Sequence, residues 1–133
     1  MKKYDKAIVG KKGERIAARF LRRQGYRIVA KNKHYGKNEL DLIAKNKDFL
    51  VFVEVKTRSF AEGEQFTRPA EAVDLAKRRR TAEAARAHLR EHPTARCPRF
   101  DVIEVYLARK RRLPVMRINH IPDAFSVGGH VRH

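Results

Sequence analysis

The first part of the chain shows a helical pattern of apolar positions. Alanine and leucine recur three and four residues apart, arginines fill much of the remaining surface, and Gly25 supplies a stop. The spacing predicts a helix over residues 5–24. Its recurring apolar residues are Ile8, Ala17, Ala18 and Leu21.

A strand pattern replaces the helical one after Gly25. Residues 26–30 predict a short strand, and a second strand is expected over residues 39–44, after a polar stretch. A turn follows at residues 46–48. Residues 49–55 are apolar on both faces except at Glu54, which is typical of a central strand covered on each side.

The segment after this central strand has no periodicity. Residues 57–68 contain Gly, Ser and alternating charges, which predicts a mobile loop and a candidate lid beside Lys56. Pro69 then suits the first turn of a second helix, which is expected to continue to about Glu91.

Two further strands, over residues 100–107 and 115–120, complete the predicted order of α-β-β-β-α-β-β. This order indicates an α/β fold with a mixed five-stranded sheet flanked by helices. We expect one domain over residues 1–125, and a disordered tail over residues 126–133 because that segment has no apolar pattern.

The composition adds a strong positive charge to this picture. The 133 residues include 32 Lys and Arg against 15 Asp and Glu, which gives a formal net charge of +17. Such an excess favours a polyanionic partner, and nucleic acid is preferred to a membrane because no apolar run reaches the roughly 20 residues of a bilayer span. With no signal-peptide pattern, the expectation is a soluble, cytoplasmic protein.

Three charged residues stand in strands that otherwise resemble buried core. Glu54 and Lys56 are two positions apart on one strand, so their side chains share a face. If residues 39–44 and 49–55 form an antiparallel hairpin, Asp41 becomes a near neighbour of Glu54. Two close carboxylates repel each other unless a cation lies between them, and carboxylate oxygens suit Mg²⁺ or Mn²⁺.

Glu14 is a further candidate for the same pocket. It lies three, four and seven residues before Ala17, Ala18 and Leu21, on the core-facing side of the first predicted helix. A metal held by these carboxylates would catalyse phosphodiester hydrolysis, with Lys56 supplying positive charge to the transition state or orienting the attacking water. Glu39 is equally compatible with supporting the ligands and with solvent exposure.

A structural interpretation of the same residues is also open. Glu54 and Lys56 could form an ion pair at a strand end, Asp41 could cap a turn, and Glu14 could lie at the helix edge. Each residue alone favours this interpretation, whereas all four together favour one pocket. Asp101 and Glu104 are expected to pair with arginines. Candidate contacts to the phosphates of a nucleic acid are Arg58, Arg68, Lys77, Arg78 and Arg80.

Several motifs together resemble a known family. They are Gly13-Glu14 with Ala17-Ala18, Gly25-Tyr26, the run from Asn38 to Ala44, the run from Val51 to Arg58, and the run from Arg99 to Ile103. Over roughly residues 8–121 the chain resembles the YraN-like uncharacterised protein family. Where that family commonly has Gly before Glu39, this chain has Asn38, which also tolerates a left-handed backbone.

The YraN-like family in turn resembles archaeal Holliday-junction resolvases of the PD-(D/E)xK nuclease superfamily. The resemblance implies a restriction-endonuclease-like core in which Asp41, Glu54 and Lys56 match the superfamily signature. It further implies that Glu14 matches the resolvases' first-helix glutamate and that the backbone carbonyl of Val55 contributes to the metal site.

Three functions follow as hypotheses. The first is a Mg²⁺- or Mn²⁺-dependent endonuclease acting on DNA, with branched DNA as the expected substrate. The second is a catalytically inactive nucleic-acid-binding module on the same fold. The third is a subunit whose activity needs a partner chain, either as a homodimer or in a larger complex.

Overall fold

The computed structural model describes residues 4–66 and 75–126. Their elements follow the predicted order of one helix, three strands, a second helix and two strands. The helices are α1 (Lys6–Arg23) and α2 (Leu75–Glu91), and the strands are β1 (Arg27–Tyr35), β2 (Asn38–Lys45), β3 (Phe49–Phe60), β4 (Cys97–Ala108) and β5 (Val115–Phe125).

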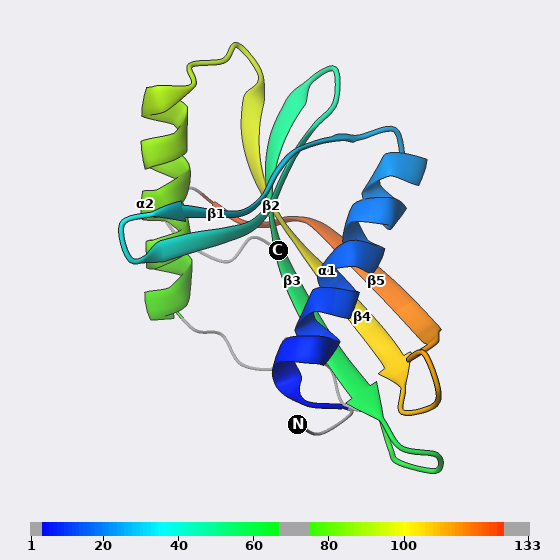
Figure 1. The fold of residues 1–133 in the computed structure, drawn as a ribbon. Coiled ribbons are helices and arrows are strands. Elements are labelled where there is room, and N and C mark those ends of the chain that lie inside the picture. Colours follow the sequence, from blue (N-terminus) through cyan, green and yellow to red (C-terminus); the bar gives the residue numbers. More distant parts are fainter. Residues whose placement is uncertain (1–3, 67–74, 127–133) are drawn as a thin grey trace.

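The strands form one mixed sheet in the order β1-β2-β3-β4-β5. Neighbouring strands are antiparallel except for β3 and β4, which run parallel and are connected through α2. A parallel pair needs such a crossover, and the crossover places a helix against the sheet. Helices α1 and α2 lie on opposite sides of the sheet (Figure 1). The predicted α/β fold with a mixed five-stranded sheet is therefore confirmed.

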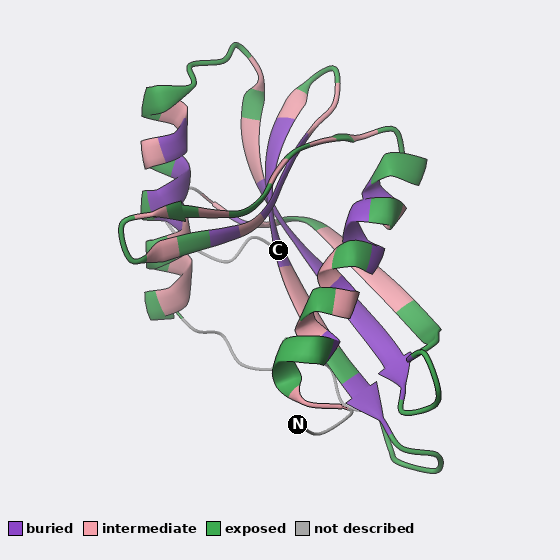
Figure 2. Cartoon of the chain, in the orientation of Figure 1, coloured by how far each residue is buried: buried purple, intermediate pink, exposed green. Residues whose placement is uncertain are grey.

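Strand β3 divides the hydrophobic core between the two faces of the sheet. Val51 and Val53 pack on the α1 side, together with Ala17 and Leu21. Phe52 points to the other face and packs with α2, where alanines form the helix surface. Purple segments on the inner sides of both helices mark these two layers (Figure 2). The predicted central strand is thus covered on each side.

Helix α1 has the ends that the sequence predicts. The Asp5 side chain accepts a hydrogen bond from the Ile8 backbone N–H at 3.1 Å, and Gly25 follows the helix with φ of +95°. The helical pattern is shifted at its start, because Val9 is buried while Ile8 remains 37% exposed. Among the described residues, no helix has the length and apolar character needed to cross a membrane.

The first hairpin is longer than its apolar pattern predicts. Strand β1 continues from Arg27 to Tyr35, through the polar stretch that was expected to be irregular, and pairs with β2 along that length. Gly36, with φ of +62°, makes the turn. β1 is an edge strand, so its outward positions tolerate lysines that a strand pattern based on apolar residues misses.

The predicted loop after the central strand is also wrong in its first four residues. Residues 57–60 continue β3 and pair in parallel register with residues 105–108 of β4. The fully buried run of β4 provides a template for this extension, and Ser59 and Phe60 are themselves buried against it. Strands β4 and β5 are likewise longer than predicted, beginning at Cys97 and ending at Phe125.

Several sequence expectations lie outside the described residues. The start of the second helix at Pro69, the last two residues of the candidate lid and the phosphate contact Arg68 fall within residues 67–74, whereas residues 61–66 form no helix or strand, as predicted. Nearly all of the expected tail falls within residues 127–133. The predicted end of the second helix at Glu91 is confirmed.

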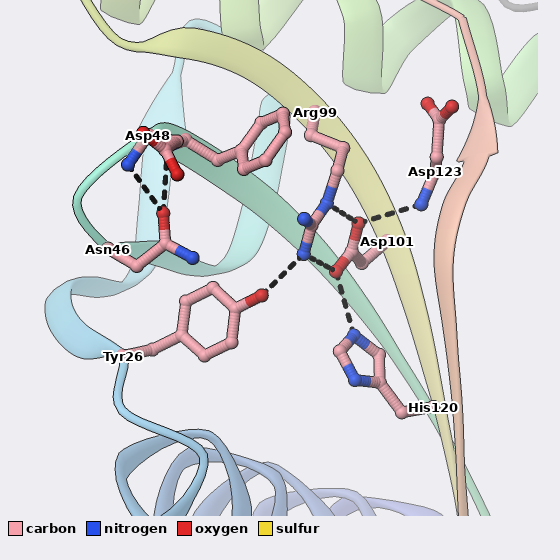
Figure 3. A network of polar contacts seen from close by, with 8 residues as sticks. Tyr26, Asn46, Asp48, Arg99, Asp101, His120 and Asp123 are labelled. Carbon is pink, nitrogen blue, oxygen red and sulfur yellow. Dashed lines mark hydrogen bonds and ion pairs between the residues drawn. The ribbon is translucent and has the colours of Figure 1, made fainter.

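A buried carboxylate in β4, that of Asp101, joins β4 to β5 (Figure 3). Asp101 accepts two hydrogen bonds from the Arg99 guanidinium, both at 2.8 Å, and one from the backbone N–H of Asp123 at 3.0 Å. His120 Nε2 lies 2.7 Å from the same carboxylate. The expected pairing of Asp101 with an arginine is confirmed, whereas Glu104 accepts a hydrogen bond from Asn119 at 2.7 Å.

Arg99 extends this network to the beginning of the sheet. Its guanidinium donates to the Tyr26 hydroxyl at 2.7 Å and lies 4.6 Å from the centre of the Phe49 ring. Tyr26 lies between α1 and β1, and Phe49 begins β3. The Arg99–Asp101 ion pair therefore connects the end of α1 with β3, β4 and β5. Burial raises the pKa of Asp101, but its bonds with His120, Arg99 and the Asp123 backbone together hold that pKa below its ordinary value.

We predict that Asp101→Asn destabilises the fold at pH 7 by about 3–5 kcal/mol, because it leaves Arg99 without its buried partner. The depressed pKa makes this stabilisation fully present above the unfolded-state pKa of about 4, and it is lost as the pH falls through the lower folded-state value. Urea unfolding followed by circular dichroism should therefore show a difference in the free energy of unfolding between wild type and variant, and this difference should become smaller in strong acid.

The matched control is Asp48→Asn, because Asp48 is exposed in the β2–β3 turn and its side chain can change with little effect on unfolding. An Asp101→Asn difference as large at pH 2 as at pH 7 would contradict the assigned role of this ion pair.

Candidate active site

The candidate site lies where β2 separates from β3. Only Leu42–Lys45 of β2 pair with β3, opposite Leu50–Val53. β3 then continues beside β4 to Phe60, while the β1–β2 hairpin swings toward α2 (Figure 1). The two strands thus form a fork that opens beyond the Leu42 and Val53 pair.

Asp41 occupies this fork. It immediately precedes Leu42, the first residue of β2 that pairs with β3, and its Oδ2 accepts a hydrogen bond from the backbone N–H of Val55 at 2.9 Å. If β2 and β3 paired further, the Val55 N–H would donate to a backbone carbonyl of β2. The Asp41 carboxylate accepts that hydrogen bond instead. The predicted juxtaposition of Asp41 with Glu54 arises in this way, one position beyond the end of the ladder rather than within it.

The backbone of Val55 also faces the fork. In an extended strand, the N–H and C=O of one residue point to the same edge. Because the Val55 N–H is directed to Asp41, its carbonyl oxygen is directed to the same opening. The backbone oxygen of Val55 therefore faces the opening that Asp41 borders.

Glu54 is buried and compensated by two ammonium groups. Its Oε1 lies 3.1 Å from Lys56 Nζ and 2.6 Å from Lys77 Nζ, and the residue is only 9% exposed. Burial raises the pKa of Glu54, but the contacts with Lys77 and Lys56 outweigh it and lower the pKa below its ordinary value. Glu54 therefore stays ionised at neutral pH.

Lys77 is the residue of this group whose role the sequence did not predict. It was expected to contact phosphates, whereas the structure directs it from α2 onto Glu54. Its spacing of four residues from Thr81 and eight from Ala85 places all three on the side of α2 that faces the sheet. That spacing was the available signal for a lysine pointing inward.

Asp41 carries a negative charge that its surroundings do not compensate. Burial, followed by the charges of Glu14 and Glu54, raises the pKa of Asp41 to about 6, although the Val55 N–H and Lys77 oppose the shift. Above that pH the fork holds a buried carboxylate close to two others. Such an arrangement attracts a cation.

Glu14 reaches the fork from α1. The preceding residue, Gly13, packs directly on the side chain of Thr57, so α1 crosses β3 at this point. Burial raises the pKa of Glu14, the charge of Glu39 adds to that increase, and a hydrogen bond with Asn32 opposes it. Glu14 thus shares the fork with Asp41, while Glu39 lies exposed at its rim.

The oxygen groups fit a divalent metal ion that also keeps water ligands. Within residues 4–66 and 75–126, no three His, Cys, Asp or Glu side chains are grouped closely enough to form a metal cage by themselves. Mg²⁺ usually takes one or two carboxylates together with water and substrate phosphate. Asp41, Glu54 and the Val55 carbonyl provide such a set, and burial followed by the charges of Glu14 and Glu54 raises the pKa of Asp41, an effect that a bound cation would oppose.

The two sides of the fork differ in how open they are. On the α1 side, a cavity of about 620 Å³ is lined by residues that include Glu14, Val55 and Lys56. On the α2 side, the hollow bordered by Asp41, Glu54 and Lys77 is only about 20 Å³. The site is therefore accessible mainly from the α1 side.

The remaining predicted phosphate contacts are dispersed. Arg58 is exposed and lies 5.6 Å from the centre of the Phe60 ring, near the open side of the fork. Arg78 lies 5.1 Å from the centre of the Phe125 ring. Arg80 is exposed on α2. Of these three residues, only Arg58 lines the cavity beside Lys56.

Comparison with known proteins places the chain in a family. Residues 13–105 match the family described as "Uncharacterised protein family UPF0102", which spans the fork and both helices. The chain belongs to the UPF0102 family. The motif resemblance noted in the sequence is thereby confirmed.

Curated UPF0102 proteins resemble the chain over nearly its full length. A UPF0102 protein of Caldanaerobacter subterraneus is 43% identical over 126 residues, which cover 94% of this chain and 100% of the relative. One from Symbiobacterium thermophilum is 48% identical over 118 residues, covering 88% and 95%. One from Porphyromonas gingivalis is 44% identical over 118 residues, covering 89% and 84%.

We predict that two glycines of α1 respond in opposite ways to alanine. A Cβ at Gly13 would overlap the Thr57 side chain, whereas a Cβ at Gly10 meets no atom within 4 Å. Gly13→Ala should therefore lower the free energy of unfolding by about 1–3 kcal/mol. Gly10→Ala should raise it by roughly 0.5–1 kcal/mol through its helix propensity.

Thermal and urea unfolding of the two variants measures this difference, with each glycine serving as the control for the other. Equal effects of the two substitutions would show that α1 does not cross β3 at Gly13.

We predict that Asp41→Asn stabilises this UPF0102 protein at pH 7 by about 1–3 kcal/mol. The amide oxygen can still accept the Val55 N–H, while the negative charge that Glu14 and Glu54 repel is removed. Urea unfolding of wild type and variant in the presence of a chelator tests this. A destabilised variant would mean that the Asp41 charge is compensated in the folded protein.

Proposed function

We propose that this UPF0102 protein is a metal-dependent endonuclease that hydrolyses phosphodiester bonds of DNA. The observation that carries the proposal is the fork itself. The half-buried Asp41, the buried Glu54 and a backbone carbonyl converge where β2 leaves β3, with Lys56 adjacent. Charged groups are buried at such cost that their convergence in one opening favours a reactive site over a structural one.

Asp41, Glu54 and the Val55 carbonyl would hold Mg²⁺ or Mn²⁺. When bound there, the ion supplies Lewis-acid activation of the phosphodiester and of water. The Val55 N–H holds the Asp41 carboxylate in place at 2.9 Å, so this ligand is oriented before substrate arrives.

The lysines have separate roles in this proposal. Lys56 lines the open cavity and lies 3.1 Å from Glu54, so its ammonium can stabilise negative charge that develops on the phosphoryl oxygens. Lys77 reaches Glu54 from α2 and fixes its carboxylate by a 2.6 Å contact. Glu14 borders the same cavity and can bind the metal or orient the attacking water.

The net charge of +17 supports a polyanionic substrate without selecting among nucleic acids. Branched DNA is the proposed substrate because of the resemblance to junction resolvases. A junction presents two strands for cleavage, so the proposal includes a homodimer that carries two forks.

A second candidate function is a nucleic-acid-binding module that does not cleave. The observation that favours it is the double ammonium contact on Glu54 Oε1, since Lys56 and Lys77 together provide this oxygen with positive charge without a metal ion. In that case the carboxylates would orient two lysines toward a nucleic acid.

We predict that Glu54→Ala and Lys56→Ala each lower the rate of Mg²⁺- or Mn²⁺-dependent cleavage at least about 100-fold, because each removes a group acting at the reacting phosphate. DNA affinity should stay within roughly threefold of wild type, since most phosphate contacts remain. Labelled junction, flap, single-stranded and RNA substrates provide the measurement. Lys47→Ala, in the exposed β2–β3 turn, is the matched control.

Calorimetric titration with Mg²⁺ and Mn²⁺ separates the two candidate functions. Metal binding that is lost in Glu54→Ala supports the nuclease. Absence of binding at millimolar metal, together with intact DNA affinity, supports the binding module. Unchanged cleavage by both variants would rule out the assigned site.

A further inference from the structure

The cavity on the α1 side extends well beyond the candidate catalytic residues. Its 620 Å³ lie between the first turns of α1, the far half of β3 and the β4–β5 turn. Glu14, Val55 and Lys56 form the part of its wall that belongs to the fork. The α2 side offers only about 20 Å³, so this cavity, which we name the α1 groove, is the larger approach to the fork among the described residues.

The walls of the α1 groove suit a sugar-phosphate backbone. Beyond Lys56, they carry the cations Lys6, Arg58 and Arg109, against Glu14 as the single carboxylate among the lining residues. Two hydroxyl side chains, Thr57 and Ser59, lie on the β3 wall. Arginine, lysine and hydroxyl groups are the usual contacts to phosphate oxygens.

Arg109 is held in a defined orientation. Its Nε donates to the Ser59 hydroxyl at 3.0 Å, and its backbone N–H donates to the Phe60 carbonyl at 2.8 Å. Ser59 is itself only 5% exposed, so the anchor belongs to the core. A guanidinium anchored through Nε still has its terminal N–H groups to present toward an anion. The neighbouring Arg111 is exposed in the same turn but does not line the groove.

We infer that the α1 groove binds a single strand of nucleic acid, with Lys6, Arg58 and Arg109 contacting phosphates on the way to Glu14 and Lys56. The inference rests on the proposed function and narrows its substrate to an unpaired strand, such as the arm of a branch or flap. The volume supports this choice. The groove of about 620 Å³ falls within the range of about 300–1,000 Å³ typical of ligand pockets, which suits one or two unpaired nucleotides.

A glycine in α1 provides a test that changes no charge. Gly10 lines the groove, and a Cβ added there meets no atom within 4 Å. Gly10→Leu therefore places a bulky side chain in the groove without disturbing the core. We expect it to weaken binding of a single-stranded DNA of about 12 nucleotides at least tenfold, a length within the usual site sizes of single-strand binders.

Charge substitutions give the second arm of the experiment. Arg109→Ala should weaken binding and reduce the slope of log affinity against log salt by about 0.7, because one phosphate contact is lost. Arg111→Ala is the matched control and should have a smaller effect. Fluorescence anisotropy of the full chain with excess chelator measures both arms, and circular dichroism confirms that each variant is folded.

Two outcomes overturn the inference: wild-type affinity in both Gly10→Leu and Arg109→Ala, or an equal loss in Arg111→Ala and Arg109→Ala. Duplex competing as strongly as single strand for the groove would also overturn it. The binding assay contains chelator, so its result does not depend on metal-dependent cleavage. If the proposed nuclease function is wrong but the inference is right, the wild-type protein will not cleave DNA, and the groove variants will still bind single-stranded DNA more weakly than wild type.

Discussion

The site depends on a difference in strand length. β3 pairs with β4 along all twelve of its residues, whereas it pairs with β2 along only four. The long parallel ladder buries the centre of the sheet and requires the crossover helix α2, so β3 continues to Phe60 after β2 has left it. Its β2 edge is therefore left with backbone groups to satisfy from Val55 onward, and the Asp41 carboxylate satisfies the first of them.

The charges in the fork are compensated unequally. Two lysine ammonium groups contact one oxygen of Glu54. Asp41 accepts one backbone N–H, and burial together with two neighbouring carboxylates raises its pKa to about 6. The Asp101 network shows how this chain stabilises a buried carboxylate when no reaction is needed, since Asp101 receives two bonds from Arg99 and others from His120 and the Asp123 backbone. Asp41 has fewer stabilising bonds than Asp101, and functional sites commonly lower the stability of the fold in this way.

Much of this arrangement was predictable from strand parity and helical spacing. The alternation around Glu54 and Lys56 fixes their common face, and the hairpin length fixes where Asp41 falls. The helical spacing of Lys77 indicates that it faces the sheet, but its contact with Glu54 was not predictable, because that contact depends on where a crossover helix lies over a parallel pair distant in the sequence. The continuation of β3 through Thr57–Phe60 was missed for a related reason, since the buried run of β4 stabilises a segment whose own pattern resembles a loop.

The β1–β2 hairpin is attached more closely to α2 than its short ladder with β3 suggests. The Tyr35 hydroxyl lies 2.6 Å from His88 Nδ1, and the Asn38 side chain donates to Glu83 at 3.5 Å. Hairpin and helix are therefore held together beyond the point where β2 leaves β3. Asp41 lies on this hairpin and Glu54 on β3, so the spacing of the two carboxylates depends on how hairpin and helix are seated on the β3–β4 ladder. The packing of Ala82 and Ala85 of α2 with Phe52 and Phe100 of the sheet consequently bears on the distance between these carboxylates.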